Sequence, residues 1–282
     1  MMAKDHPTYA YKVHSNSSAT KVARLAGSGK RVLELGCGPG MITRLLADQQ
    51  CRVTALERDA HAVEAVAQYC ETVHTCDLND PAWPGTLANA PKFEVIVAGD
   101  VLEHLLDPWA TVERLTPLLA EGGHVVISLP HAGHNALIAC LVASDFAYQP
   151  WGLLDKTHIR FFGMHNIQSL CERAGLKITE VDYVIKPPEH SEFARRWRQL
   201  PTATQRALAA NPFGSVYQVI VKAVPKSAAG KGLLLTSLTL PNSGALGRVT
   251  TGNRLWRYLL SFLSLNTRQS IGKSLVRMGL RR

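Results

Sequence analysis

The sequence lacks the features that mark metal-binding, redox-active and exported proteins. Its six cysteines form no C-x-x-C pair and have no regular spacing, so we expect reduced thiols in a cytoplasmic protein. The first residues hold no apolar stretch of the kind that a secretory signal needs, and we expect no export. The long stretch Val125–Ser144 has no Lys, Arg, Asp or Glu, but it contains Pro130 and two histidines. It predicts a strand, a loop and a short apolar helix rather than a membrane span.

Acidic residues are missing from the C-terminal part of the chain. Residues 225–282 contain ten Lys or Arg and no Asp or Glu, whereas residues 1–224 carry 21 basic and 22 acidic residues. The whole net charge of +9 therefore belongs to this tail, and any anionic partner is expected to bind there.

Aromatic and aliphatic residues are interleaved with the basic residues of the tail. Trp256, Tyr258, Leu259, Phe262 and Leu263 occur at mixed helical spacing, with Arg254 and Arg257 nearby. This composition is typical of a helix that lies on anionic lipid, so peripheral membrane contact through residues 254–282, at the inner face of the membrane, is one interpretation. The others are a helix docked on the main domain and an RNA-binding segment. No RNA-binding motif is recognisable, so nucleic acid is not the favoured partner.

Short apolar runs alternate with helical stretches from Lys30 onward, which predicts parallel βαβ units. The predicted strands are 31–35, 52–56, 73–76, 93–98, 124–129, 176–183 and 215–224, and the predicted helices are 41–49, 60–70, 108–119 and 166–174. We divide the chain into an N-terminal helical cap (1–28), an α/β domain (29–224) with an insertion at 130–165, and a basic linker with an amphipathic helical tail (225–282).

The residues Val32–Gly40 read V-L-E-L-G-C-G-P-G where a strand ends and a helix begins. Glycines let the backbone approach a ligand closely, and the helix N-terminus offers free N–H groups. The spacing is G-x-G-x-G rather than the G-x-G-x-x-G of dinucleotide sites. Glu34 would repel a pyrophosphate and attract the ammonium group of a methionine moiety, and Glu57 stands where a carboxylate can accept hydrogen bonds from ribose hydroxyls. The pattern favours S-adenosylmethionine (SAM) over NAD and over a turn without a ligand.

With these motifs the chain resembles the class I SAM-dependent methyltransferase family over about residues 25–224. The segments 76–78, 93–105 and 122–128 are similar to that family's adenine-contacting segment, fourth strand and fifth strand. The resemblance implies a Rossmann-like, mostly parallel seven-stranded sheet with helices on both faces, and SAM as the cofactor. It also implies cofactor contacts from Glu34, Gly36, Cys37, Gly38, Gly40, Glu57, Asp77, Leu78 and Gly99.

Methyl transfer needs alignment of the reactants, and a base where the acceptor is a hydroxyl. The candidate bases are His104, His131 and His158, on loops at the carboxyl edge of the predicted sheet. The run 155–162, D-K-T-H-I-R-F-F, resembles one found in quinone-precursor O-methyltransferases and in methyltransferases of bacterial glycan and secondary metabolism. The resemblance implies acceptor contacts from Asp155, Arg160 and Phe161. For His158 and Arg160 a structural brace is the alternative.

The turn Asp100-x-x-Glu103-His104 would place two carboxylates and an imidazole on one face if it is helical. It resembles the E-x-x-E-H metal cluster of small-RNA 2′-O-methyltransferases and of some quinone O-methyltransferases. Asp100 is one methylene shorter than the residue it would replace, and we therefore favour a site without metal.

The sequence as a whole favours a SAM-dependent methyltransferase that modifies an oxygen of a small or lipid-linked metabolite. An RNA methyltransferase guided by the basic tail and a non-catalytic module with a SAM-binding fold are the alternatives. The retained acids and glycines of the predicted cofactor site argue against the non-catalytic module.

Overall fold

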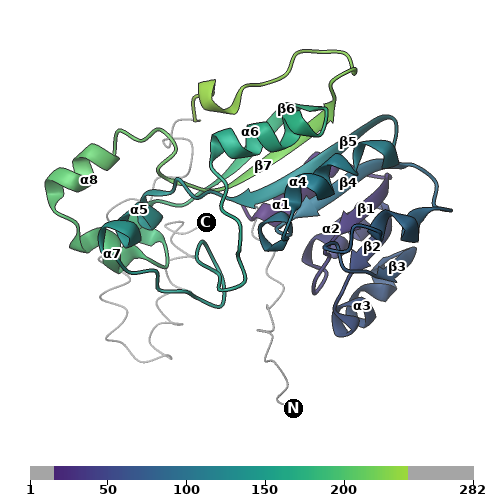
Figure 1. The fold of residues 1–282 in the computed structure, drawn as a ribbon, viewed down its shortest axis with the longest axis horizontal. Coiled ribbons are helices and arrows are strands. Elements are labelled where there is room, and N and C mark those ends of the chain that lie inside the picture. The colour runs from purple at the N-terminus through teal and green to yellow at the C-terminus, as the bar shows by residue number, and fades with distance from the viewer. Residues whose placement is uncertain (1–15, 241–282) are drawn as a thin grey trace, which may run out of the picture. The chain divides into compact units, whose positions relative to one another are not determined.

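The computed structural model describes residues 16–240, in which seven strands form one sheet (Figure 1). The strands are β1 (Arg31–Leu35), β2 (Arg52–Glu57), β3 (Thr72–Thr75), β4 (Phe93–Gly99), β5 (Leu119–Pro130), β6 (Leu176–Ile185) and β7 (Val216–Pro225). Their order is β3-β2-β1-β4-β5-β7-β6, and only β7 runs antiparallel to its neighbours. The predicted mostly parallel, Rossmann-like seven-stranded sheet is confirmed.

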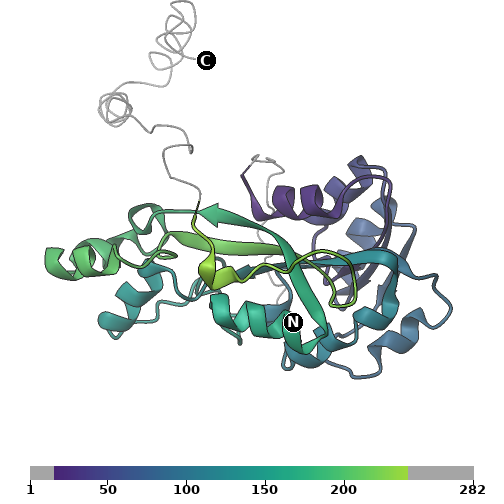
Figure 2. The same ribbon diagram turned by 90° about the horizontal axis from the view of Figure 1, so that it is seen from above.

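Helices cover both faces of the sheet. They are α1 (Ser18–Ala26), α2 (Met41–Asp48), α3 (Ala60–Val66), α4 (Pro108–Glu113), α5 (Asn135–Val142), α6 (Met164–Arg173), α7 (Ala194–Gln199) and α8 (Thr202–Leu208). Helix α1 packs against α2, and α4 packs against α6. Figure 2 shows α1 and α6 on opposite faces of the sheet. Because helices cover both faces, the central strands are apolar nearly throughout, and Val32, Leu33 and Ile96 are fully buried.

A second apolar cluster lies beyond the end of β5. Helix α5 contacts α7, and both lie at the left of Figure 1. The buried members of this cluster are Ala136, Leu137, Cys140, Leu153, Leu154 and Phe193. The predicted insertion thus has a core of its own, which gives the loops after β5 a fixed scaffold.

Several predicted boundaries differ from the structure: the expected strand 124–129 is longer, at Leu119–Pro130, and the expected helix 60–70 ends at Val66. The expected helix 108–119 ends at Glu113, and a 3-10 turn at Thr116–Leu118 leads into β5, because Pro117 cannot donate a backbone hydrogen bond within a helix. The first part of the expected linker packs on the domain: Leu235 is buried, and the Leu233 N–H donates to the Ile178 carbonyl at 2.7 Å. The predicted amphipathic tail, 254–282, lies outside the described residues.

Candidate active site

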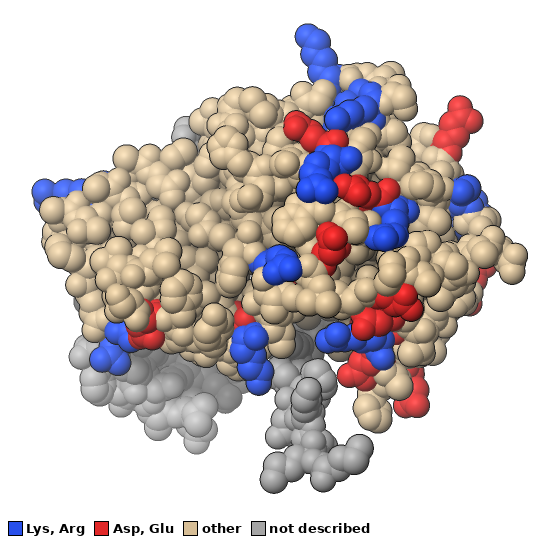
Figure 3. Space-filling model, viewed as in Figure 1, with Lys and Arg blue, Asp and Glu red and all other residues tan. Residues whose placement is uncertain are grey.

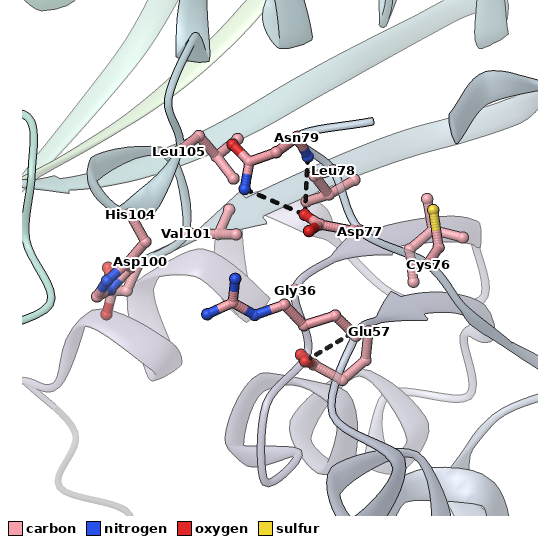
Figure 4. A pocket seen from close by; sticks show the side chains of 12 residues that line it. Gly36, Glu57, Cys76, Asp77, Leu78, Asn79, Asp100, Val101, His104 and Leu105 are labelled. Carbon is pink, nitrogen blue, oxygen red and sulfur yellow. Dashed lines mark hydrogen bonds between the residues drawn. The ribbon is translucent and has the colours of Figure 1, made fainter. Parts of the chain in front are cut away.

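An open cavity lies at the carboxyl edge of the sheet, where the turns after β1, β2, β3 and β4 meet (Figure 4). Its lining comprises Gly36, Leu56, Glu57, Arg58, Cys76, Asp77, Leu78, Asn79, Asp100, Val101, His104 and Leu105. Six of the candidate site residues are among them: Gly36, Glu57, Asp77, Leu78, Asp100 and His104. In Figure 4, Asp100 and His104 lie at one end of the cavity, and Asp77 and Cys76 lie towards the other. The cavity therefore has two polar ends.

The carboxylate of Glu57 is held in place by backbone amides. Its Oε2 accepts from the Gly38 N–H at 2.8 Å, and its Oε1 accepts from the amides of Arg58 and Asp59 at 2.8 and 3.0 Å. Gly36 donates its N–H to the Leu56 carbonyl at 2.7 Å. These bonds fix the glycine turn to the end of β2, so the acid and the turn form one unit.

The turn after β3 supplies the second acid of the cavity. Asp77 Oδ1 accepts from the backbone N–H and the side-chain amide of Asn79, at 2.9 and 3.1 Å. The Asn79 Oδ1 in turn accepts from the Leu106 N–H at 2.8 Å, which joins this turn to the one after β4. Leu78 is largely buried beside them. A rigid polar end with an apolar wall suits the face and the edge of a heterocyclic base.

Five other predicted cofactor residues lie outside the lining: Glu34, Cys37, Gly38, Gly40 and Gly99. Glu34 is 2% exposed beneath the glycine turn, and its Oε2 has no hydrogen-bond partner within the described part of the chain. Gly40 faces Val66, and Gly99 faces Ile42, so close that an added Cβ would lie 2.5 and 2.3 Å from those side chains. These two glycines are explained by packing within the domain.

Cys37 is also buried, and desolvation raises the pKa of its thiol. Burial likewise raises the pKa of Glu34 from 4.5 to about 8, because a charge is costly there. Glu34 is thus mostly uncharged at neutral pH, and its predicted contact with an ammonium group has no support in this arrangement.

The burial of Glu34 predicts how stability changes with pH. Because its folded pKa of about 8 exceeds the usual 4.5, the folded protein keeps a proton that the unfolded chain releases between these values. Stability is therefore lost as the pH rises from 4.5 to 8. We expect the melting temperature of wild type to fall by about 5 °C more between pH 5.5 and 8 than that of Glu34→Gln, which cannot ionise.

Thermal unfolding at a series of pH values measures this difference. Glu94→Gln is the control, because hydrogen bonds from Arg31 and Lys30 lower the pKa of Glu94 and keep it ionised over the whole interval. Parallel curves for wild type and Glu34→Gln would mean that Glu34 is charged in the folded protein.

Two of the three predicted bases lie together. The His104 and His158 rings are 4.8 Å apart between centroids, edge to face, and His104 Nδ1 lies 3.1 Å from the Thr157 carbonyl oxygen. His158 is mostly buried, and desolvation and the neighbouring His104 lower its pKa to about 4. His104 lines the cavity, whereas His158 does not. The geometry thus favours His104 over His158 as the group that meets a reactant.

The third predicted base, His131, is 3% exposed and lies away from this cavity. Its Nδ1 is 3.2 Å from the Val216 carbonyl oxygen, and its ring lies edge to face with Phe213. Desolvation lowers its pKa to about 4. His131 therefore fixes the start of the insertion to the sheet.

The run 155–162 joins the insertion to the turn after β4. The amides of Ile159 and Arg160 both donate to the Glu103 carbonyl at 3.0 Å, and the Arg160 guanidinium donates to the Leu106 carbonyl at 2.6 Å. Asp155 Oδ1 accepts from the N–H and the hydroxyl of Thr157. Of the three predicted acceptor contacts, Asp155 and Arg160 are thus engaged in this brace, and only Phe161 has a largely exposed side chain, at 46%.

Glu103, His104 and His158 offer ligand atoms that lie within 4.8 Å of one another. The Glu103 carboxyl is 1% exposed, neither oxygen has a hydrogen-bond partner among the described residues, and desolvation raises its pKa well above 4.5. Its Oε1 lies 3.9 Å from His158 Nε2, yet the opposite pKa shifts of the two groups make them a neutral pair rather than an ion pair. A carboxylate and two imidazoles could hold a divalent cation. The carboxylate of Asp100, the first residue of the predicted cluster, instead accepts hydrogen bonds from side chains of α1, β5 and β7.

Sequence reasoning did not single out several lining residues, above all Arg58, Asn79 and Val101. Each of them stands one to two residues after a predicted site residue, at the carboxyl end of a parallel strand. Their position directly after a strand is the sequence signal that could have identified them.

Comparisons with known proteins fit the geometry of this cavity. A family model described as a methyltransferase domain matches residues 9–181. A ubiquinone biosynthesis O-methyltransferase of Psychrobacter cryohalolentis is 25% identical over 185 residues, which cover 64% of this chain and 65% of that protein. The corresponding protein of Aromatoleum aromaticum is 26% identical over 165 residues, which cover 57% of this chain and 70% of that one. The chain thus spans less than two thirds of the first of these relatives.

One solved structure extends the comparison to the fold. The [4+2]-cyclase SpnF superposes with a TM-score of 0.51 at 16% identity, and the match covers 80% of this chain and 86% of that one. At this identity the likeness concerns the fold alone. Because that protein is named as a cyclase, the shared fold does not fix the reaction.

Proposed function

The chain belongs to the class I SAM-dependent methyltransferase family, and from this premise we propose that it transfers a methyl group from SAM to an oxygen atom of a small or lipid-linked acceptor. The observation that carries the proposal is the set of acids in the cavity, Glu57, Asp77 and Asp100, on the turns after β2, β3 and β4. Three carboxylates in one cavity favour the binding of a cationic nucleoside and repel a diphosphate.

The residues of the cavity fit the parts of SAM. Glu57 would hold the ribose and Asp77 the amino group of the adenine, with Leu78 against its ring. Gly36 lets the backbone approach the ligand. When bound, SAM supplies a methyl group already activated by the sulfonium, so the protein has to align the acceptor and exclude water.

His104 is the group best placed to remove a proton from an acceptor hydroxyl. It lines the cavity beside Asp100, and the contact of Nδ1 with the Thr157 carbonyl orients its ring. That contact leaves Nε2 for the acceptor. The two relatives named above are O-methyltransferases by name, which supports oxygen as the acceptor atom.

The surface of the insertion supports an apolar acceptor. Charged side chains are sparse on the left of Figure 3, the part of the molecule that holds α5, α7 and α8. Several large apolar side chains of the insertion are exposed: Leu141, Val142, Phe146, Tyr148, Trp151, Ile159 and Phe161. No helix within residues 16–240 is long and apolar enough to cross a membrane. Contact with lipid would therefore be peripheral, through this insertion or through the proposed membrane-binding segment 254–282.

A transfer assay with methyl-labelled SAM tests the proposal. We expect label in small phenols or in a lipid extract, and none in total RNA. Label in RNA alone would favour the alternative in which the basic tail guides an RNA methyltransferase. SAM binding without transfer to any of the three would favour a non-catalytic module.

The assay also decides whether a metal takes part. The proposed reaction needs no Lewis acid, because the methyl group is already activated, and we expect full activity after dialysis against a chelator. Loss of activity that one divalent cation restores in wild type, but not in Glu103→Gln, would assign the Glu103–His104–His158 group as a metal site.

A further inference from the structure

Asp100 is the acid at the His104 end of the cavity. It follows β4 directly and has a φ of 54°, in the left-handed region that residues other than glycine rarely adopt. A non-glycine residue in this conformation is maintained only where its surroundings require it. The backbone there turns the Asp100 carboxylate into the lining of the cavity, beside His104 (Figure 4).

Three donors from separate elements hold this carboxylate. Its Oδ1 accepts from the Ser128 hydroxyl of β5 at 2.5 Å and from the Gln218 amide of β7, and its Oδ2 accepts from the Ser18 hydroxyl of α1 at 3.3 Å. Gln218 also donates to Ser128 at 2.9 Å, which closes the network. Such a network fixes the position of a carboxylate to a fraction of an ångström.

The surroundings of Asp100 differ from those of Glu34. Asp100 is open to solvent through the cavity, although the protein packed around it raises its pKa. Glu34 lies under the glycine turn, out of the lining. A ligand in the cavity can therefore reach Asp100, but it cannot reach Glu34 without opening the turn.

Because the acids occupy different positions in the cavity, each would contact a different part of the ligand. Glu57 and Asp77 line the nucleoside end, so the amino-acid end of SAM would lie towards Asp100 and His104. That end carries an α-ammonium group, which needs a fixed anion or several carbonyls once water is excluded. We propose that the Asp100 carboxylate, and not Glu34, accepts the α-ammonium group of the cofactor, with Gln218 and Ser128 as positioning residues. The proposal rests on the proposed function.

Binding calorimetry with two ligands tests it: S-adenosylhomocysteine, and its analogue without the α-amino group. We expect wild type to bind the complete ligand 10- to 100-fold more tightly than the analogue, the range for a hydrogen bond between charged groups. Asp100→Asn should bring this ratio to within about 3-fold and leave the affinity for the analogue nearly unchanged. Glu34→Gln should keep the wild-type ratio.

Other outcomes overturn the proposal. The proposal fails if Asp100→Asn keeps the wild-type ratio between the affinities for the two ligands. It also fails if Asp100→Asn loses affinity for both ligands equally, because a residue that only shapes the cavity or orients His104 gives that result. In either case SAM binding and the proposed function still stand. If wild type binds neither ligand, the proposed function itself falls.

A second variant keeps the test decisive if Asp100→Asn does not fold. Gln218→Ala leaves the carboxylate in place but removes one of its donors. We expect the ratio to fall about 3- to 10-fold, because a less firmly held carboxylate binds the ammonium less well. An unchanged ratio in folded Gln218→Ala would count against the proposal.

Discussion

Replacing Gly36 by alanine is expected to weaken the binding of S-adenosylhomocysteine about 100-fold. Gly36 has a φ of 62°, and an added Cβ would lie 2.4 Å from Val101 Cγ2, a contact that no packed structure tolerates. The left-handed backbone costs about 1–2 kcal/mol in alanine, and overpacking costs about 1–3 kcal/mol more. Both Gly36 and Val101 line the cavity, so relief of this strain moves the walls that would hold the ligand.

Two further variants separate the causes of this loss. Gly27→Ala also strains the backbone, since Gly27 has φ 83° and ψ −176°, a region essentially restricted to glycine, but nothing lies within 4 Å of its added Cβ. We expect it to lower stability by about 1–3 kcal/mol and to leave binding within about 3-fold of wild type. Adding Val101→Ala to Gly36→Ala removes the contact with Cγ2, leaves one of 3.1 Å with the Cβ of residue 101, and should restore about 10-fold in affinity. Calorimetric titrations of the three variants against wild type measure these effects, and wild-type binding by Gly36→Ala would contradict the assignment of the cavity.

His104→Asn is expected to lower kcat by a factor of about 100 to 10,000, the usual contribution of a general base. Asparagine can keep the contact that His104 Nδ1 makes with the Thr157 carbonyl, but it has no counterpart of Nε2. The affinity for S-adenosylhomocysteine should therefore change less than about 3-fold. Steady-state kinetics together with calorimetry separate the two effects.

His124 provides a matched control for this variant. Its Nε2 also lies 3.1 Å from a backbone carbonyl oxygen, that of Leu25, but in a part of the molecule that does not line the cavity. Because the amide of glutamine reaches the position of Nε2, His124→Gln can keep this contact, and we expect it to keep kcat within about 3-fold of wild type. If both variants lose activity equally, the loss comes from structure rather than from proton transfer.

The strands were the most predictable part of the fold. The run Arg31–Leu35 has the same bounds in the structure as in the prediction, because the apolar residues Val32, Leu33 and Leu35 of a strand buried on both faces stand directly before a glycine turn. Helices α7 and α8, by contrast, were not predicted. The stretch Ala194–Leu208 is rich in Arg, Gln and Thr, so no apolar period marks it. Contact with α5, which no local pattern reveals, stabilises α7.

The site was predictable where backbone geometry determines it. Gly36 and Glu57 follow from their positions at the ends of neighbouring parallel strands. Glu34 also stands at a strand end, but how deeply its side chain is buried depends on the elements packed over β1. The side chain of Asp100 was considered only as a metal ligand, since its donors come from α1, β5 and β7, more than 25 residues away along the chain. Contacts between such distant segments are not readable from one sequence.

Calorimetric titration of the purified protein with S-adenosylhomocysteine, and separately with NAD, tests the central claim most directly. The cavity with Glu57, Asp77 and Asp100 predicts one site that binds the thioether nucleoside at micromolar concentration and gives no heat with NAD. Saturable binding of NAD, or no binding of S-adenosylhomocysteine at 1 mM, roughly the upper limit of ordinary cofactor affinities, would contradict it.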